Sequence, residues 1–341
     1  MPHDSPSPES DLLERARSGD TPAFDALIKP HRRRVHLHCY RMLGSPQDAD
    51  DALQETLLAA WRGLQTFEGR SALGTWLHQI GTRVCLRLIS QRPPRLLSAD
   101  YAPALTATAD LGEPVPGPVW IEPLPDAEAF DIEDQRDPAS ALLRRESVAL
   151  AFIAALQHLP GTQRAVLLLR EVLEYSAAEA AEMLETSVAS VNSALQRAQK
   201  TVKERLGVRS QTAEMKPLDQ PEVERLLQAF VKAWESRDVP GLVGLLSEDA
   251  RFTMPPLPAW FDGRASVQSF ISERLFATPW RLRPLRANGQ AGFACYMQMP
   301  GREGFHLGAV NLLSLRDGRI EAIHGFLDPL VLQRFRLPAE I

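Results

Sequence analysis

The sequence contains little cysteine: Cys39, Cys85 and Cys295 are the only three in 341 residues. No two of them have the short spacing of a zinc-binding pair, and three separated cysteines do not indicate a disulfide framework. We therefore expect three buried thiols in the reducing cytoplasm, with no metal site and no cofactor.

Long apolar runs are also missing. No apolar stretch approaches the roughly 18 residues that a membrane-spanning helix requires, so we expect no membrane span. The first ten residues, MPHDSPSPES, are polar and acidic, which is not the pattern of a signal peptide. The length of 341 residues suggests two or three domains.

The chain has no overall excess of positive charge, which is unusual for a protein that binds DNA. Its net charge is -5. Residues 98–138, however, hold ten Asp or Glu against one Arg, a net of -9, which leaves +4 on the remainder. The negative net charge therefore comes from one acidic segment, and the rest of the chain is mildly basic.

Hydrophobic periodicity and turn residues divide the chain into blocks of different character. The last block begins with an amphipathic helix and continues with strand signals separated by the turn dipeptides Asn288-Gly289, Pro300-Gly301 and Asp317-Gly318. We expect a multidomain protein with two all-α domains and a C-terminal α+β domain. The predicted boundaries are 11–92 (helical), 93–138 (an acidic, proline-rich linker without periodicity), 139–206 (helical), 207–220 (a polar linker) and 221–341 (α+β).

Residues 176–200 have the outline of a helix-turn-helix, whose second helix enters the major groove of DNA. Ser176 and Glu179 have the spacing of a capping box at the start of the first helix. Glu185 occupies the turn, where glycine is usual because φ is often positive. The second helix is predicted to bury a stripe formed by Val188, Val191, Leu195, Ala198 and Val202. This leaves for DNA the polar residues Ser187, Ser190, Asn192, Ser193, Gln196, Arg197 and Lys200.

The first helical block carries two further groups of residues. The helix over 48–64 has an acidic and amide-bearing face, which by itself is most simply a solvated surface. That face consists of Asp48, Asp51, Gln54 and Glu55. The loop and helix that follow combine aromatic and cationic side chains, a mixture that suits single-stranded DNA. Those residues are Phe67, Arg70, Ser71 and Trp76, although the helical spacing of Trp76 also fits the core.

The order of these blocks resembles an extracytoplasmic-function sigma factor of bacterial RNA polymerase. Two long stretches carry the resemblance: CYRMLGSPQDADDALQETLLAAWRGLQTFEGRSALGTWLHQIGTRVCL and LPGTQRAVLLLREVLEYSAAEAAEMLETSVASVNSALQRAQ. The resemblance implies that 11–92 is sigma domain two and 139–206 is sigma domain four. It also implies that the linker threads the RNA exit channel of the polymerase.

The resemblance assigns roles to the groups described above. The Asp48, Asp51, Gln54 and Glu55 face would bind the β′ clamp of core RNA polymerase, and sigma domain four would bind the β flap. Phe67, Arg70, Ser71 and Trp76, with Arg83 and Arg87 on the same helix, would read the minus-ten element of promoter DNA. The seven polar residues of the second helix-turn-helix helix would read the minus-thirty-five element.

The C-terminal block resembles a SnoaL-like domain, a cone of helices on a curved sheet, through LLSEDARFTMPPLPAWFDGRASV and GFLDPLVLQRFRLP. In related isomerases an Asp acts as general base, but Met254 stands at that position here. We therefore expect no catalytic residue and no enzymatic activity. Trp260, Tyr296, His306 and His324 are candidates to line a pocket for a small molecule, and the domain is expected to regulate the sigma factor in cis.

Two alternatives stay open at this point. A ligand-sensing helix-turn-helix repressor would bind DNA tightly without polymerase, but it leaves the match over 48–76 unexplained. A cyclase or isomerase tethered to DNA-binding helices would turn over a substrate, and the methionine at the base position argues against it.

Overall fold

A computed structural model of the chain resolves two compact units, and each unit is built from two separate stretches of sequence. Contacts group the first helical block with most of the second in one unit, and the linker and the two ends of the second helical block with the C-terminal block in the other. The structure describes residues 8–130, 146–206 and 221–341. The units are 1–94 with 156–201, and 95–155 with 202–341.

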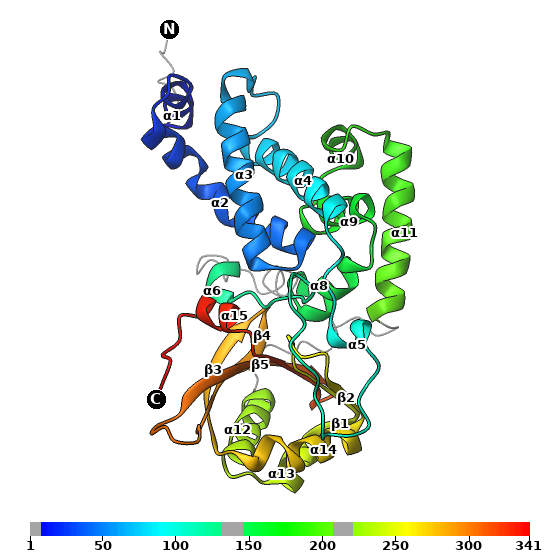
Figure 1. Ribbon diagram of the computed structural model, residues 1–341. Helices are drawn as coiled ribbons and strands as arrows, with labels where there is room; N and C mark the ends of the chain where they lie inside the picture. The colour runs from blue at the N-terminus through cyan, green and yellow to red at the C-terminus, as the bar shows by residue number, and fades with distance from the viewer. Residues whose placement is uncertain (1–7, 131–145, 207–220) are drawn as a thin grey trace. The chain divides into compact units, whose positions relative to one another are not determined.

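The first unit is helical (Figure 1). Asp20 caps the second helix by accepting a hydrogen bond from the Ala23 amide, and Ser45 caps the third by accepting one from Asp48. Gly44, with φ of 75°, ends the helix between them. The elements are α1 (Pro8–Arg17), α2 (Thr21–Leu43), α3 (Pro46–Gly63), η1 (Leu64–Thr66), α4 (Leu73–Gln91), α9 (Gly161–Leu167), η3 (Leu168–Val172), α10 (Ala177–Met183) and α11 (Val188–Leu206).

Helix α9 packs against α2 and α4, so the two helical blocks of the sequence meet in one unit. Gly161 permits this approach, because a Cβ there would lie 3.2 Å from Leu86 Cδ2 and 3.3 Å from Ile89 Cγ2. Cys39 and Cys85 are buried in the same unit, and Cys295 is buried in the other. The prediction of three buried thiols is confirmed.

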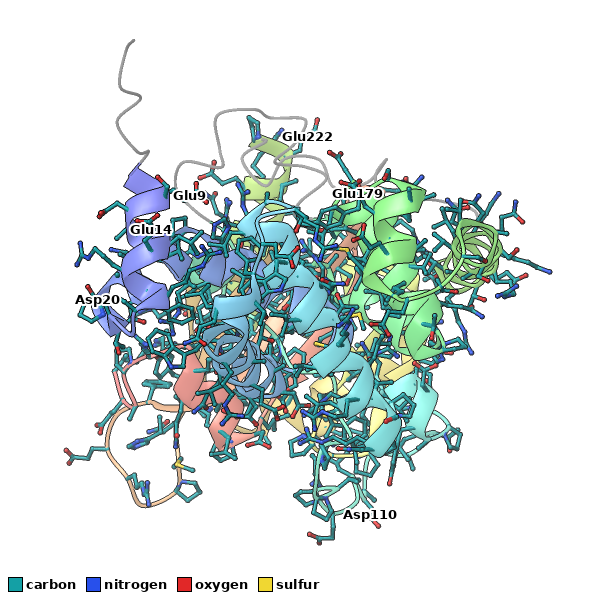
Figure 2. All side chains as sticks on the ribbon, turned by 90° about the horizontal axis from the view of Figure 1, so that it is seen from above. Glu9, Glu14, Asp20, Asp110, Glu179 and Glu222 are labelled. Carbon is teal, nitrogen blue, oxygen red and sulfur yellow. The ribbon has the colours of Figure 1, made fainter. Side chains whose placement is uncertain are left out.

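The helix-turn-helix has its own small core, to which Met183, Val191 and Ala194 contribute. Glu179, labelled in Figure 2, completes the predicted capping box with Ser176. Glu185 has φ of 52°, so the left-handed turn forms without a glycine. The predicted stripe is wrong at the start of α11, where Val188 is 44% exposed.

The second unit contains a six-stranded sheet in the order β2-β1-β6-β5-β4-β3. Strands β1 and β6 are parallel, and all other neighbours are antiparallel. Its elements are α12 (Pro221–Glu235), α13 (Val239–Gly244), β1 (Leu246–Thr253), β2 (Trp260–Asp262), α14 (Arg264–Glu273), η5 (Leu275–Ala277), β3 (Trp280–Ala287), β4 (Gln290–Met297), β5 (His306–Arg316), β6 (Arg319–Phe326) and α15 (Pro329–Arg334).

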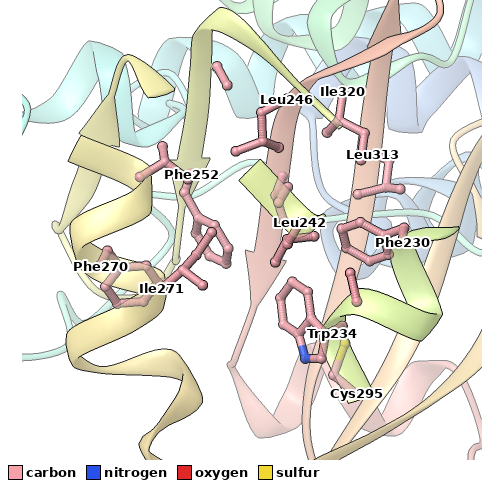
Figure 3. Packing of buried hydrophobic residues seen from close by; sticks show 14 of the residues in the cluster. Phe230, Trp234, Leu242, Leu246, Phe252, Phe270, Ile271, Cys295, Leu313 and Ile320 are labelled. Carbon is pink, nitrogen blue, oxygen red and sulfur yellow. The ribbon is translucent and has the colours of Figure 1, made fainter. Parts of the chain in front are cut away.

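Helices α12, α13 and α14 cover one face of this sheet, and the space between them is filled by aromatic and aliphatic side chains (Figure 3). Phe230 and Trp234 of α12 lie with ring centroids 5.1 Å apart, and Phe230 stacks on Phe293 of β4 at 5.3 Å. Met254, at the position of the isomerase base, is part of the same buried cluster. The predicted α+β domain is confirmed.

The acidic linker differs from expectation. Residues 95–130 of it follow a defined path along the second unit and include the short helices α5 (Ser98–Tyr101) and α6 (Asp126–Ala129). The Trp260 indole donates to the Ala102 carbonyl at 2.7 Å, and the Val115 amide donates to Pro256 at 2.9 Å. Periodicity was absent because single hydrogen bonds and isolated β-bridges, such as that between Pro125 and Ala287, hold this segment in place of a long helix or strand. Residues 131–138 of the linker lie outside the described part of the chain.

None of the described helices is long and apolar enough to span a membrane.

Candidate polymerase and nucleic-acid interfaces

The predicted acidic face of α3 is partly occupied by the protein itself. Asp48 is 8% exposed and its carboxylate accepts a hydrogen bond from Arg92 at 2.6 Å. Glu55 pairs with Arg87 of α4. Asp51 and Gln54 are exposed. Of the four residues predicted to bind polymerase, only these last two are therefore presented to solvent without an ion pair to α4 or its flank.

A groove of about 640 Å³ lies between α2 and α3. Phe24 and Trp61 form its aromatic floor, in edge-to-face contact at 5.0 Å, and Leu58 on its rim is 49% exposed. Gln54 is the one predicted polymerase-binding residue that lines it. Leu57, Leu58 and Trp61 are the signal for it in the sequence, but helical spacing does not distinguish an open groove from a buried core. Its lining residues are Thr21, Phe24, Asp25, Ile28, Arg32, Asp50, Leu53, Gln54, Leu57, Leu58 and Trp61.

The loop predicted to bind melted DNA keeps its aromatic side chain inside. Phe67 is 9% exposed and packs on Trp76 with ring centroids 4.7 Å apart. Arg17 of α1 donates to the Phe67 carbonyl. Arg70 is exposed and pairs with Glu68 at 2.7 Å, and Ser71 is exposed. The ring on which a base was expected to stack is thus covered in this conformation.

Both predicted arginines of α4 are paired with carboxylates. Arg83 lies 2.9 Å from Glu185 at the turn of the helix-turn-helix, and Arg87 pairs with Glu55. The partners are 102 and 32 positions away in sequence, so sequence patterns do not reveal them. The first pair ties the predicted minus-ten helix to the predicted minus-thirty-five reader.

Two further contacts join the same blocks. The Tyr175 hydroxyl lies 3.1 Å from His78 Nδ1 of α4, and burial lowers the pKa of His78 to about 4. Arg164 of α9 is 2% exposed and donates to the Met42 carbonyl at the end of α2. The same guanidinium donates to the side chain and the carbonyl of Gln157 and to the carbonyl of Leu159. Burial lowers the pKa of Arg164 to about 10.

Helix α11 and the residue before it expose all of the seven polar residues predicted to face DNA: Ser187, Ser190, Asn192, Ser193, Gln196, Arg197 and Lys200. Two of them are engaged with each other. The Ser187 hydroxyl caps the helix by accepting from the Ser190 amide at 3.1 Å and lies 2.9 Å from the Ser190 hydroxyl. The first turn therefore offers fewer free hydrogen-bonding groups than its sequence suggests.

The four pocket candidates of the C-terminal domain lie outside its main hydrophobic core. None belongs to the cluster that fills the space between helices and sheet. Trp260 holds the linker, and His306 lies 3.0 Å from the Glu303 carbonyl. His324 hydrogen-bonds Thr253 at 3.1 Å, and burial lowers its pKa to about 4. Tyr296 is buried, which raises the pKa of its hydroxyl. In the described ranges no group of His, Cys, Asp and Glu is arranged to hold a metal ion.

Comparison with known families agrees with this architecture. The chain matches the families described as Sigma-70 region 2 over residues 27–93, Sigma-70, region 4 over 149–202, and SnoaL-like domain over 227–323.

Individual proteins extend the match to nearly the whole chain. The ECF RNA polymerase sigma factor SigG of Mycobacterium tuberculosis H37Rv is 40% identical over 334 residues, covering 94% of this chain and 85% of that protein. SigM of the same strain is 31% identical over 199 residues, covering 58% and 85%. The crystal structure of the M. tuberculosis extracytoplasmic function sigma factor SigJ superposes with a TM-score of 0.61 at 20% identity, over 92% of this chain and 99% of that one, which shows a shared fold.

Proposed function

We propose, from the premise that this chain belongs to the extracytoplasmic-function sigma factors of bacterial RNA polymerase, that the free protein holds its two promoter-reading helices together and that core polymerase separates them. The chain is a sigma factor, which directs transcription initiation. The observation that carries the proposal is that α4 packs against α9 and lies in one compact unit with α10 and most of α11.

The size of that unit makes opening necessary. A compact unit of about 140 residues has a radius of gyration of about 14 Å and is roughly 40 Å across. The minus-ten and minus-thirty-five elements are separated by about 25 base pairs, or about 85 Å of duplex at about 3.4 Å per base pair. Helices held within one unit of this size do not reach both elements at once.

Opening breaks the packing of α9 on α2 and α4, the contact between Tyr175 and His78, and two arginine contacts. The Arg83–Glu185 pair is exposed and contributes at most about 1 kcal/mol. The buried hydrogen bond from Arg164 to the Met42 carbonyl is stronger, because a carbonyl that loses a charged donor must be rehydrated. Opening hydrates the guanidinium as well, and this offsets part of the cost.

The groove between α2 and α3 suits the first contact with polymerase. It is open in the closed unit, and it combines an apolar floor with Gln54 and the adjacent exposed Asp51. An apolar centre with a polar rim is the usual composition of a protein interface. We assign the β′ clamp contact to this groove, with Asp48 and Glu55 supporting the position of α4 through Arg92 and Arg87.

For the C-terminal domain we propose regulation in cis without catalysis. It binds residues 95–130, the segment expected to enter the RNA exit channel, and therefore controls when that segment is available. Methionine stands at the position of the isomerase base, and the interior of the domain is tightly filled with apolar side chains. Both features support a role in binding the linker instead of catalysis. Acting on promoter DNA places the protein in the cytoplasm.

The test combines transcription with a distance measurement. Dyes are attached to cysteines introduced at the exposed Gln65 and Glu182, since the native thiols are buried. We expect high energy transfer in the free chain, a large decrease on adding core polymerase, and run-off transcripts from a promoter selected by the holoenzyme.

Two results would count against the proposal. Unchanged energy transfer in a transcribing holoenzyme refutes opening. DNA binding without any promoter-specific transcript favours a repressor.

A further inference from the structure

The first turn of the recognition helix presents an apolar side chain to solvent. Val188 is the first residue of α11, directly after the capping Ser187, and is 44% exposed. It belongs to the few large hydrophobic side chains with this exposure among the described residues. An exposed valine at a helix start has neither a capping function nor a favourable helix propensity to explain it.

The core of the helix-turn-helix begins one turn later. Val191 and Ala194 are buried beside Met183 of α10, whereas Val188 takes no part in that cluster. The residue therefore does not stabilise the domain by burial in this conformation. Its isopropyl group is available for a contact that the free protein does not contain.

The polar neighbours of Val188 are less available. The hydroxyls of Ser187 and Ser190 are hydrogen-bonded within the first turn. Ala189 is small and exposed, so it permits close approach of this end of the helix to another surface. The side chain at the N-terminal end of α11 that has no contact within the turn is thus the apolar Val188. The Asn192 amide lies one turn further along the same side of the helix.

We propose that Val188 is a specificity-determining residue that contacts the 5-methyl group of a thymine in the upstream promoter element. The N-terminal residues of a recognition helix reach the base edges of the major groove. Thymine alone presents a methyl group there, and apolar side chains contact it. This inference rests on the proposed function, because it requires that α11 reads promoter DNA.

The expected effect follows from the area involved. Burial of one methyl group against an aliphatic side chain changes affinity by about fourfold. Removing either the thymine methyl group or the Val188 isopropyl group should weaken promoter binding by this factor. Removing both groups should weaken binding no more than removing one of them. Val188→Thr, which keeps the shape but replaces one methyl by a hydroxyl, should lose part of it.

The test is a double-mutant cycle on the full chain assembled with core polymerase. A promoter is first selected by the wild-type holoenzyme from a randomised library. Each thymine of its upstream element is then replaced by deoxyuridine, which lacks only the methyl group. Promoter affinity is measured for wild type, Val188→Ala and the control Gln199→Ala, an exposed polar residue of the same helix that is not among those predicted to face DNA.

We expect one thymine at which deoxyuridine weakens promoter binding by wild type and by Gln199→Ala about fourfold and leaves binding by Val188→Ala unchanged. Additive effects at every thymine, with normal transcription by the wild type, overturn the role of Val188. Failure of the wild type to select any promoter instead refutes the proposed function itself. Unfolding curves of the variants confirm that each remains folded.

Discussion

His324 is a buried base in a position where its charge is costly. Its ring nitrogens face Thr253 at 3.1 Å and Ser314 at 3.4 Å, and burial lowers its pKa to about 4. The positive charge of Arg251 lowers this pKa further, because it disfavours a second positive charge on the imidazole. The ring is therefore a neutral hydrogen-bonding member of the sheet, which agrees with a structural role.

The titration of His324 predicts a loss of stability in mild acid. The unfolded chain binds this proton with a pKa of about 6.5, whereas the folded chain does so only near 4, so stability falls as the pH drops between these values. Between about pH 7 and pH 5 the loss should be about 2 kcal/mol. Urea unfolding of wild type and His324→Asn, followed by tryptophan fluorescence, measures it. An equal pH dependence in both proteins would contradict the assignment.

At the residue scale, local signals were predictable and tertiary partners were not. The capping box of Ser176 and Glu179 and the left-handed turn at Glu185 depend on neighbouring residues, and both were found from sequence. The ion pairs of Asp48 and Glu55 join positions 44 and 32 residues apart, which no local pattern encodes. Val188 was misassigned because helical periodicity continues past the point where the core beneath it ends.

At the scale of elements, α3 illustrates how an amphipathic helix can have a third face. One side is buried, one side pairs with the basic residues of α4 and its flank, and one side lines the groove with α2. Sequence periodicity separates apolar from polar positions but does not distinguish a core from an apolar groove. The groove depends on the angle between α2 and α3, which packing of distant residues sets.

The groove gives a direct prediction for polymerase binding. Leu58→Asp places a charge on an exposed rim, so it should not unfold the unit but should weaken binding to core polymerase at least tenfold, because a buried unpaired charge in an interface costs about 1–3 kcal/mol or more. The matched control is Leu330→Asp, at a leucine that is 75% exposed on α15. Fluorescence anisotropy of labelled chain titrated with core polymerase is the measurement. Equal affinities for the two variants would remove the groove from the interface.

At the scale of the whole molecule, Asn288 joins three distant segments. Its side chain accepts from the Leu124 amide at 2.8 Å and donates to the Val148 carbonyl at 2.6 Å, and its own amide donates to the Leu124 carbonyl. The Asn288-Gly289 turn was found from sequence as a hairpin signal. Its second role was hidden, because the linker that it holds has no pattern of its own.

Removing this side chain should free the linker. Asn288→Gly tolerates the positive φ of 55° but loses the side-chain hydrogen bonds to Leu124 and Val148. We expect faster proteolysis within residues 95–130 and a stability lower by about 2 kcal/mol. Asp317→Gly, the corresponding change in the β5–β6 turn, is the control. Equal digestion of both variants would argue that Asn288 does not hold the linker. Mass spectrometry of limited digests locates the cleavage sites.

The distance between Leu124 and Asn288 along the chain also orders events during synthesis. The 164 residues between them are translated on the order of ten seconds after the linker has emerged. In the later part of that interval, after residue 206 has been made, the nascent protein contains both helices proposed to read the promoter, but the ribosome has not yet made the asparagine that holds the segment between them. A chain that binds core polymerase before Asn288 has been synthesised therefore binds it before the C-terminal domain can restrain the linker.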